Sequence, residues 1–237
     1  MSEVRSRFHQ ALDEMEVDLA QMGRLSEAMV RDAVRALVER NDDLAERVIV
    51  ADDDVDQLYL KVDHGSLDLL ALQAPVAADL RLVSVLLHCS LHVERIGDQA
   101  VNIAKIHLGT KSLPSSDPIL QRIAEMGDLV VVMVETAIEA FRRRDLELCL
   151  RLPSMDDPVD RLNRTLYLEI LKLADDLRAL DWGMHVNLAA RALERVGDNA
   201  VDIGEQVAFL ITGEFREFTD ASHPDGEPTV DALRNGG

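Results

Sequence analysis

Acidic side chains recur at intervals of four residues along this chain, and that spacing could let them bind a cation. On an α-helix, residues four apart lie on one face and form a stripe. The members of two such stripes are Glu94, Asp98 and Asn102, and Glu194, Asp198 and Asp202. Like charges at this spacing repel one another, so a pair that occurs twice needs a counter-charge. Arg95 and Arg195, which point roughly 100° around the helix, are one candidate, and a bound metal ion is the other.

Two further pairs of aspartates share the spacing, and they are Asp52 with Asp56 and Asp156 with Asp160. If an antiparallel helix hairpin closes near Ala74, Asp56 lies 18 residues before the turn and Glu94 lies 20 residues after it. Equal rise per residue then brings the pairs level. A hairpin closing near Asp175 gives a similar register in the second half. Four carboxylates on one face suit a hard divalent cation or iron, whereas a solvated acidic face is the alternative interpretation of any single pair.

The chain repeats itself in sequence. Residues 93–103 and 193–203 are identical at seven of eleven positions, at an offset of 100. Upstream, four residues recur in order at an offset of 104, and they are Asp52, Val55, Asp56 and Leu58, matched by Asp156, Val159, Asp160 and Leu162. Two ordered matches indicate that a structural unit has been duplicated. Gly97 and Gly197, inside the repeat, predict the close approach of a neighbouring helix or of a cation, because glycine within a helix costs about 1 kcal/mol relative to alanine.

The elements that position these residues are predicted to be helices. Aromatic residues make up only 3% of the chain, which disfavours strands, and prolines are absent from residues 1–74 and 159–223, which leaves room for long helices. The predicted helices cover about 4–40, 44–72, 75–108, 119–144, a segment around Pro153 and Pro158 that reaches about 174, and 177–211. The sequence thus predicts an all-α protein with two tandem three-helix bundles at 1–109 and 119–213, a linker at 110–118 and a flexible tail at 214–237.

Composition excludes several classes of function. The chain has 237 residues and a formal net charge of −19, which argues against nucleic-acid binding. The longest stretch without Asp, Glu, Lys or Arg, residues 82–93, is too short to span a bilayer, and the first residues contain no apolar core of a signal peptide. We therefore expect a cytoplasmic protein without direct membrane insertion. Cys89 and Cys149 are expected to be buried thiols in a reducing compartment.

Other chemical motifs are weak or absent. His88 and His92 have the spacing of a helical metal-binding pair, but His92 aligns with Ala192 in the repeat, so both are predicted to be surface or core histidines. The sequence contains no Gly-rich phosphate-binding loop, no nucleophile elbow and no Glu-x-x-His motif. A catalytic residue is therefore not predicted.

The repeated motif Glu-Arg-Ile/Val-Gly-Asp-x-Ala-Val-x-Ile resembles the PhoU family of phosphate-specific transport accessory and regulatory proteins. The segment at residues 72–81, Leu-Gln-Ala-Pro-Val-Ala-Ala-Asp-Leu-Arg, is similar to the same family, and the resemblance covers residues 5 to 213. It implies two tandem three-helix bundles. It also implies metal clusters held by paired acidic motifs, which here are Glu94 and Asp98 with Asp52 and Asp56, and Glu194 and Asp198 with Asp156 and Asp160. The metal could be iron, zinc, manganese or magnesium.

The resemblance also implies a function and partners. Family members are similar in being non-enzymatic regulators that dampen the phosphate-starvation response. They link the ATPase subunit of a phosphate importer to a sensor histidine kinase, often as homodimers. Membrane recruitment would then run through partner proteins. A metal-dependent enzyme built on the helical bundle and a metal-free helical adaptor are the competing hypotheses.

Two departures from a perfect repeat bear on this interpretation. The first stripe ends in Asn102 and the second in Asp202, so the two sites could differ in metal affinity. The second half also lacks the segment that ends at Arg81. Arg81 is therefore interpreted either as a contact for a partner or as a solvated helix residue.

Overall fold

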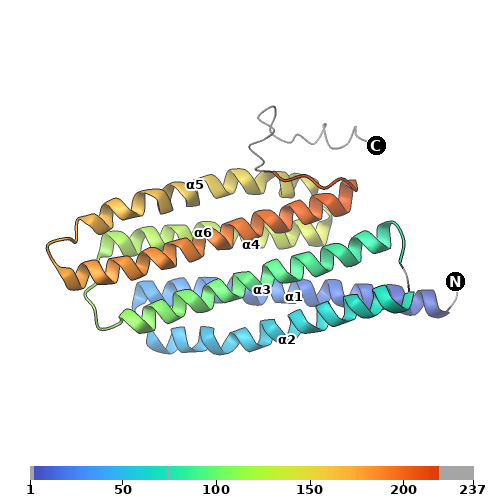
Figure 1. Ribbon diagram of the computed structural model, residues 1–237, viewed down its shortest axis with the longest axis horizontal. Coiled ribbons are helices and arrows are strands. Elements are labelled where there is room, and N and C mark those ends of the chain that lie inside the picture. The colour runs from blue at the N-terminus through green and yellow to red at the C-terminus, as the bar shows by residue number, and fades with distance from the viewer. Residues whose placement is uncertain (1–2, 74, 219–237) are drawn as a thin grey trace.

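The computed structural model describes residues 3–73 and 75–218, and it contains six long helices in this part of the chain (Figure 1). Their bounds are α1 Glu3–Glu39, α2 Asp42–Gln73, α3 Ala78–Thr110, α4 Asp117–Arg143, α5 Leu146–Leu171 and α6 Leu177–Thr212. The described residues include no strand. The prediction of an all-α protein is confirmed. Most of the predicted tail, residues 219–237, lies outside the described residues.

The helices form two antiparallel three-helix units that lie side by side, α1–α3 below α4–α6 in Figure 1. Within each unit the three helices pack on one another. Across the boundary between the units, which we call the seam, α1 packs on α4 and α3 packs on α6. Apolar residues three or seven positions apart along α1 are buried, and examples are Leu12, Leu19, Met22 and Met29. An apolar stripe at this period buries itself against neighbouring helices, so one continuous core joins the two units.

Polar side chains define where several helices begin. Asp145 and Asp176 accept hydrogen bonds from the first backbone N–H groups of α5 and α6, at 2.9–3.2 Å. Asn41 does the same for α2, where the Leu44 N–H donates at 3.0 Å. Such caps satisfy donors that have no partner inside the helix. The predicted break at residues 41–43 therefore coincides with the start of α2.

One predicted boundary is wrong in detail. Pro75 does not open α3, which begins three residues later at Ala78, after Ala77 adopts a left-handed φ of 50°. Pro153 and Pro158 lie inside α5, within the segment predicted around them. Proline has no N–H group and therefore removes a hydrogen bond from a helix interior. Pro153 leaves the Cys149 carbonyl without its partner in α5. Gly204 of α6 lies against this place, since a Cβ on Gly204 would stand 3.5 Å from the carbonyl oxygen. Tertiary packing thus overrides the local signal.

The seam between α1 and α4 is nearly symmetric. A Cβ on Gly127 of α4 would meet Val34 of α1 at 2.7 Å, and a Cβ on Gly23 of α1 would collide with Ile138 of α4. Both glycines and both partners are related by the same offset of 104 positions. Reciprocal contacts of this kind are the mark of a two-fold arrangement. The duplicated units therefore pack through equivalent surfaces.

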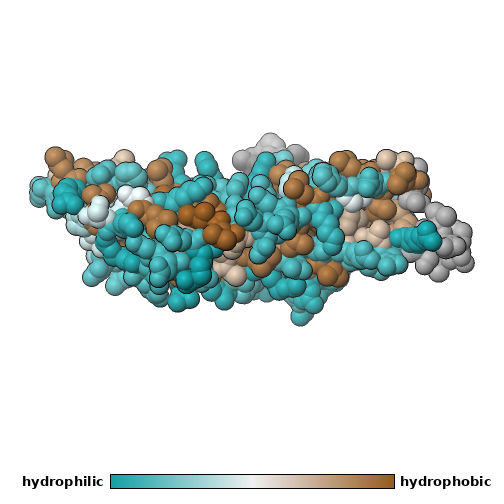
Figure 2. Space-filling view, turned by 90° about the horizontal axis from the view of Figure 1, so that it is seen from below, coloured by the Kyte–Doolittle hydropathy of each residue, from teal (hydrophilic) through white to brown (hydrophobic). Residues whose placement is uncertain are grey.

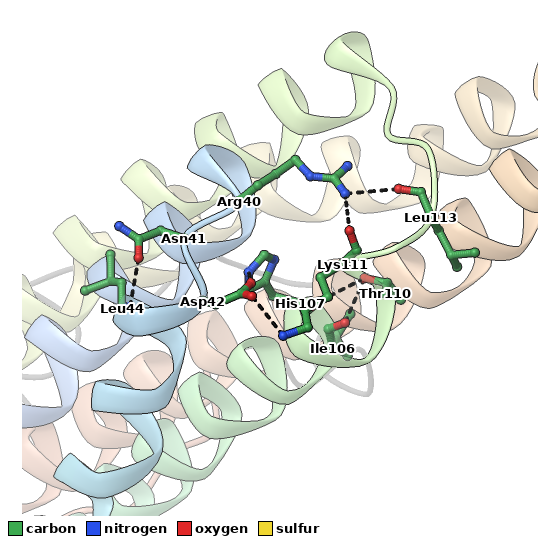
Figure 3. Close-up of polar contacts among 9 residues, drawn as sticks. All are labelled: Arg40, Asn41, Asp42, Leu44, Ile106, His107, Thr110, Lys111 and Leu113. Carbon is green, nitrogen blue, oxygen red and sulfur yellow. Dashed lines mark hydrogen bonds and ion pairs between the residues drawn. The ribbon is translucent and has the colours of Figure 1, made fainter.

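Charged side chains hold the connection between the units against the α1–α2 turn (Figure 3). Arg40 donates to the backbone carbonyls of Lys111 and Leu113, at 2.5 and 3.1 Å. Asp42 accepts from Lys111 at 2.9 Å and lies 2.9 Å from Nε2 of the buried His107. The linker at 111–116 is therefore fastened to the first unit by charged groups.

The surface in Figure 2 is mainly hydrophilic, and hydrophobic residues form separate patches on it. Of the helices that the structure describes, none is long and apolar enough to cross a membrane. Cys89 and Cys149 are buried and do not form a disulfide, as predicted.

Candidate functional site

The first group of predicted ligands gathers on the hairpin of α2 and α3, and we call it the first carboxylate cluster. Its members are Asp52, Asp56, Glu94 and Asp98. Burial, reinforced by the negative charges of Asp56 and Asp98, raises the pKa of Asp52 to about 6. Burial and the charges of the other three members also raise the pKa of Glu94. The four carboxylates are therefore close enough to interact electrostatically, as the predicted register of the two helices implied.

The second carboxylate cluster occupies the equivalent hairpin of α5 and α6. Its members are Asp156, Asp160, Glu194 and Asp198. Burial and the charges of Asp198, Asp160 and Glu194 raise the pKa of Asp156 to about 7. Burial, followed by the charges of Glu194 and Asp160, raises the pKa of Asp198 to about 6. Burial is the first cause of the raised pKa values in both clusters, and the pKa of Asp156 is raised further than that of Asp52.

Both glycines of the repeat lie under an aspartate of the partner helix. A Cβ on Gly97 would stand 3.4 Å from Oδ1 of Asp52, and a Cβ on Gly197 would collide with Oδ1 of Asp156. That Asp156 oxygen is buried and has no hydrogen-bond partner. The close approach that the glycines predicted is thus made by the carboxylate-bearing helix. An unpaired buried carboxylate oxygen is also the feature that a cation would satisfy.

The clusters are not preformed ligand sets. In the described part of the chain, no group of three or more His, Cys, Asp and Glu side chains is placed so that it could hold a metal ion. Asp160 is instead turned toward Arg164, at 3.2 Å. The donor atoms fit a hard cation in kind, since all are carboxylate oxygens, and binding would require the side chains to move toward one another.

The ends of the two stripes lie at the seam between α3 and α6. Asp202 lies 3.3 Å from Nδ1 of His92, and the same nitrogen lies 2.9 Å from Oδ1 of Asn199. His92 is thus a partly buried contact between the units, which its spacing from His88 did not reveal. Asn102 faces a groove on the other side of the same seam. The ends of the two stripes, Asn102 and Asp202, therefore have different surroundings.

Arg81 has a structural neighbour that the sequence did not indicate. It lies beside Gly213 at the end of α6, because a Cβ added to Gly213 would stand 3.3 Å from Nη1 of Arg81. A cation at a helix C-terminus interacts favourably with the helix dipole. Arg81 is half-buried here rather than fully solvated, and its role as a partner contact stays a prediction.

Two sequence-related antiparallel three-helix units, each with a carboxylate cluster on one hairpin, define a class of duplicated helical proteins. A family model described as the PhoU domain matches residues 19–106 and again residues 123–207. The chain belongs to the PhoU family.

Similar proteins agree with this assignment. The chain is 34% identical to a phosphate-specific transport system accessory protein PhoU homolog of Pseudomonas putida, over 93% of this chain and 84% of that protein. A homolog of the same name from Pseudomonas aeruginosa is 33% identical, over 93% and 89%. The crystal structure of PhoU from Pseudomonas aeruginosa is similar with a TM-score of 0.83 and 33% identity, covering 87% of this chain and 100% of that one. The phosphate transport system regulatory protein PhoU from Streptococcus pneumoniae has a TM-score of 0.78 and 26% identity, over 88% and 99%.

Proposed function

We propose that this chain is a non-enzymatic cytoplasmic regulator of phosphate uptake that dampens the phosphate-starvation response. The observation that carries the proposal is the doubled PhoU domain, together with relatives named as accessory proteins of a phosphate transport system. The partners would be the ATPase subunit of a phosphate importer and a sensor histidine kinase, with the chain acting as a homodimer. A formal charge of −19 favours basic partner surfaces and opposes direct contact with anionic lipid.

We further propose that the two carboxylate clusters bind metal ions. What supports this is the pairing of eight carboxylates in two equivalent places, the raised pKa values of Asp52 and Asp156, and the unpaired buried oxygen of Asp156. A divalent cation would neutralise the repulsion within each cluster and tie the two helices of its hairpin together. Iron, zinc, manganese and magnesium are the candidates.

The metal proposal is tested by elemental analysis after purification without chelators. A variant with Glu94, Asp98, Glu194 and Asp198 changed to Ala should lose the metal that the wild type retains. The matched control changes four exposed acids outside the clusters to Ala, namely Asp13, Asp68, Glu125 and Asp128, and should retain it. Equal metal in all three proteins would indicate adventitious binding to an acidic surface, and a melting temperature unaffected by added metal would argue for a metal-free adaptor.

The regulatory proposal is tested in the organism that carries the gene. Deletion should switch on phosphate-starvation genes in high-phosphate medium, and the wild-type gene should restore repression. Co-purification of the importer ATPase or the sensor kinase with tagged wild-type protein would identify the partner. Unchanged expression after deletion would contradict the proposal, and turnover of phosphate esters by the metal-loaded protein would favour the enzyme hypothesis.

A further inference from the structure

A groove of about 520 Å³ runs along the seam between α3 and α6, on the side of the linker. Asn102, Lys105 and Gly109 line it from α3, and Arg191, Ala192 and Arg195 line it from α6. His185 lies at one end. We call this feature the α3/α6 groove, and its volume is within the range of small-molecule sites.

The groove is open because two positions carry no bulky side chain. The repeat relates Ala192 to His92 and Gly109 to Phe209. At the equivalent place across the seam, His92 fills the space and contacts Asn199 and Asp202. Around Gly109 there is open space, since a Cβ there would meet no atom within 4 Å. One end of the seam is thus closed by an imidazole, and the other end is left hollow.

The repeat also gives the two ends different side-chain charges. Lys105 corresponds to Glu205, Asn102 to Asp202, and Arg191 to Leu91, so each exchange makes the groove more positive than its counterpart. None of the described residues that line the groove is acidic, although the chain has 44 acidic residues against 25 basic ones. The larger hollow between α1 and α2, by contrast, includes Asp32, Glu46 and Asp53. A cationic concavity is therefore exceptional on this surface.

The cations of the groove lack partners within the described part of the molecule. The side chains of Lys105, Arg191 and Arg195 form no hydrogen bond or ion pair with a described residue, although the fields of Lys105 and Arg195 reach Asp52 and Asp198 and lower their pKa values slightly against the larger effect of burial. Arg191 and Arg195 are four residues apart on one helix, where like charges repel. An anion between α3 and α6 would remove that repulsion.

We propose that the α3/α6 groove binds a phosphate group. Arginine offers a planar fork of donors that matches phosphate oxygens, and Arg191 and Arg195 present two of them from one wall. Lys105 and the amide of Asn102 approach from the other wall. A tetrahedral anion with several oxygens can accept from both walls at once, which gives the facing cations a common ligand.

The inference rests on the proposed role in phosphate regulation, because a regulator of uptake that binds phosphate could read the supply directly. Phosphate binding by the purified chain is nevertheless measured without any partner. If the purified chain does not bind phosphate, the effect of gene deletion on phosphate-starvation genes is unaffected. If deletion has no such effect, phosphate binding by the purified chain can still be measured. The two outcomes are therefore distinguishable.

The test is equilibrium dialysis of the full chain with radiolabelled inorganic phosphate at fixed ionic strength and with EDTA present. Arg191→Leu introduces the residue that the repeat carries at position 91, and Lys105→Glu introduces the residue at position 205. Both positions are exposed, so folding should survive. We expect saturable binding by the wild type and about tenfold or greater weakening in each variant. The matched control, Arg151→Leu on α5, removes an exposed arginine outside the groove and should leave the affinity unchanged.

A second arm distinguishes the source of the phosphate group. Vesicles of phosphatidylglycerol, with phosphatidylcholine as reference, test a lipid headgroup in place of free phosphate. Binding of either ligand that Arg191→Leu and Lys105→Glu weaken supports the proposal and identifies the source. The proposal would be overturned if the wild type bound neither ligand, or if Arg151→Leu weakened binding as much as the groove variants do. It would also be overturned if binding required metal and was unchanged in the groove variants.

Discussion

The two carboxylate clusters have the same residues at the same spacing, yet their surroundings make them chemically different. Lys105 lies near enough to Asp52 to offset part of the charge in the first cluster. The repeat places Glu205 at the equivalent position of the second half, and Asp202 adds a further negative charge near Asp198. The pKa is raised to about 6 for Asp52 and to about 7 for Asp156. Duplication therefore preserved the acidic motif while the neighbouring positions diverged.

The difference teaches where to look for specialisation in a duplicated fold. The residues that repeat build the helix hairpins and their carboxylates. The residues that do not repeat, such as His92 against Ala192 and Lys105 against Glu205, lie along the seam where the two units meet. We therefore expect the two halves to differ in function at the residues along the seam.

The largest expected effect concerns the glycines of the α1/α4 seam. Gly127→Ala should destabilise the fold by about 2–3 kcal/mol, because its Cβ would meet the stiff, branched side chain of Val34. Gly23→Ala should cost a comparable amount, since its Cβ would collide with Cδ1 and Cγ1 of Ile138, which is β-branched as well. Urea unfolding of the two variants makes the comparison. Val34→Ala should rescue Gly127→Ala, and a cost at only one of the two glycines would contradict the reciprocal packing.

The next effect is the pH dependence of stability in metal-free protein. Asp156 has a folded pKa of about 7 against an ordinary value of 3.8, so the folded state holds its proton more tightly and stability falls as pH rises from about 4 to about 7. Asp156→Asn should remove on the order of 1–2 kcal/mol of that decline, after allowance for solvent screening. Unfolding curves at pH 5 and pH 8 in EDTA provide the measurement. Asp52→Asn should remove less, and a larger effect there would reverse the ranking of the clusters.

A smaller effect is expected where only one half carries a histidine. His92→Ala removes the contact with Asn199 at 2.9 Å and makes position 92 match position 192. The loss should be about 1 kcal/mol, as for an ordinary buried hydrogen bond. His88→Ala is the control, because His88 is exposed and contacts only the Ser84 carbonyl of its own helix. Equal stability of the two variants would show that the seam does not depend on this contact.

The smallest effect is expected for the ion pair of Arg31 with Glu135, at 3.0 Å. These residues are themselves related by the offset of 104, so the pair joins equivalent points of the two units. Both side chains are about half exposed, at 52% and 53%, and such pairs contribute little. Arg31→Ala should change the free energy of unfolding by less than about 0.5 kcal/mol. A loss above 1 kcal/mol would mean that charge, rather than glycine packing, holds the units together.

Much of the fold could be predicted because its signals are local. The apolar spacing of α1, the caps near Asn41 and the gaps between prolines each act over one or a few turns. The start of α5 was left open by the sequence, because Pro153 and Pro158 lie inside this helix, where proline normally removes a hydrogen bond. The start of α3 was misplaced because the left-handed turn at Ala77 depends on how the hairpin closes.

The order of the residues is enough to predict a duplicated helical protein with paired acidic motifs. Helix periodicity and internal repetition can both be recognised from the order of the residues. The register of Asp56 with Glu94 follows from counting residues along two helices with the same rise per residue. The tertiary structure alone decided that His92 closes one end of the seam, that Ala192 and Gly109 leave the other end open, and that Arg81 lies at the end of α6. These contacts join residues from different helices, and only the packing of the two units brings them together.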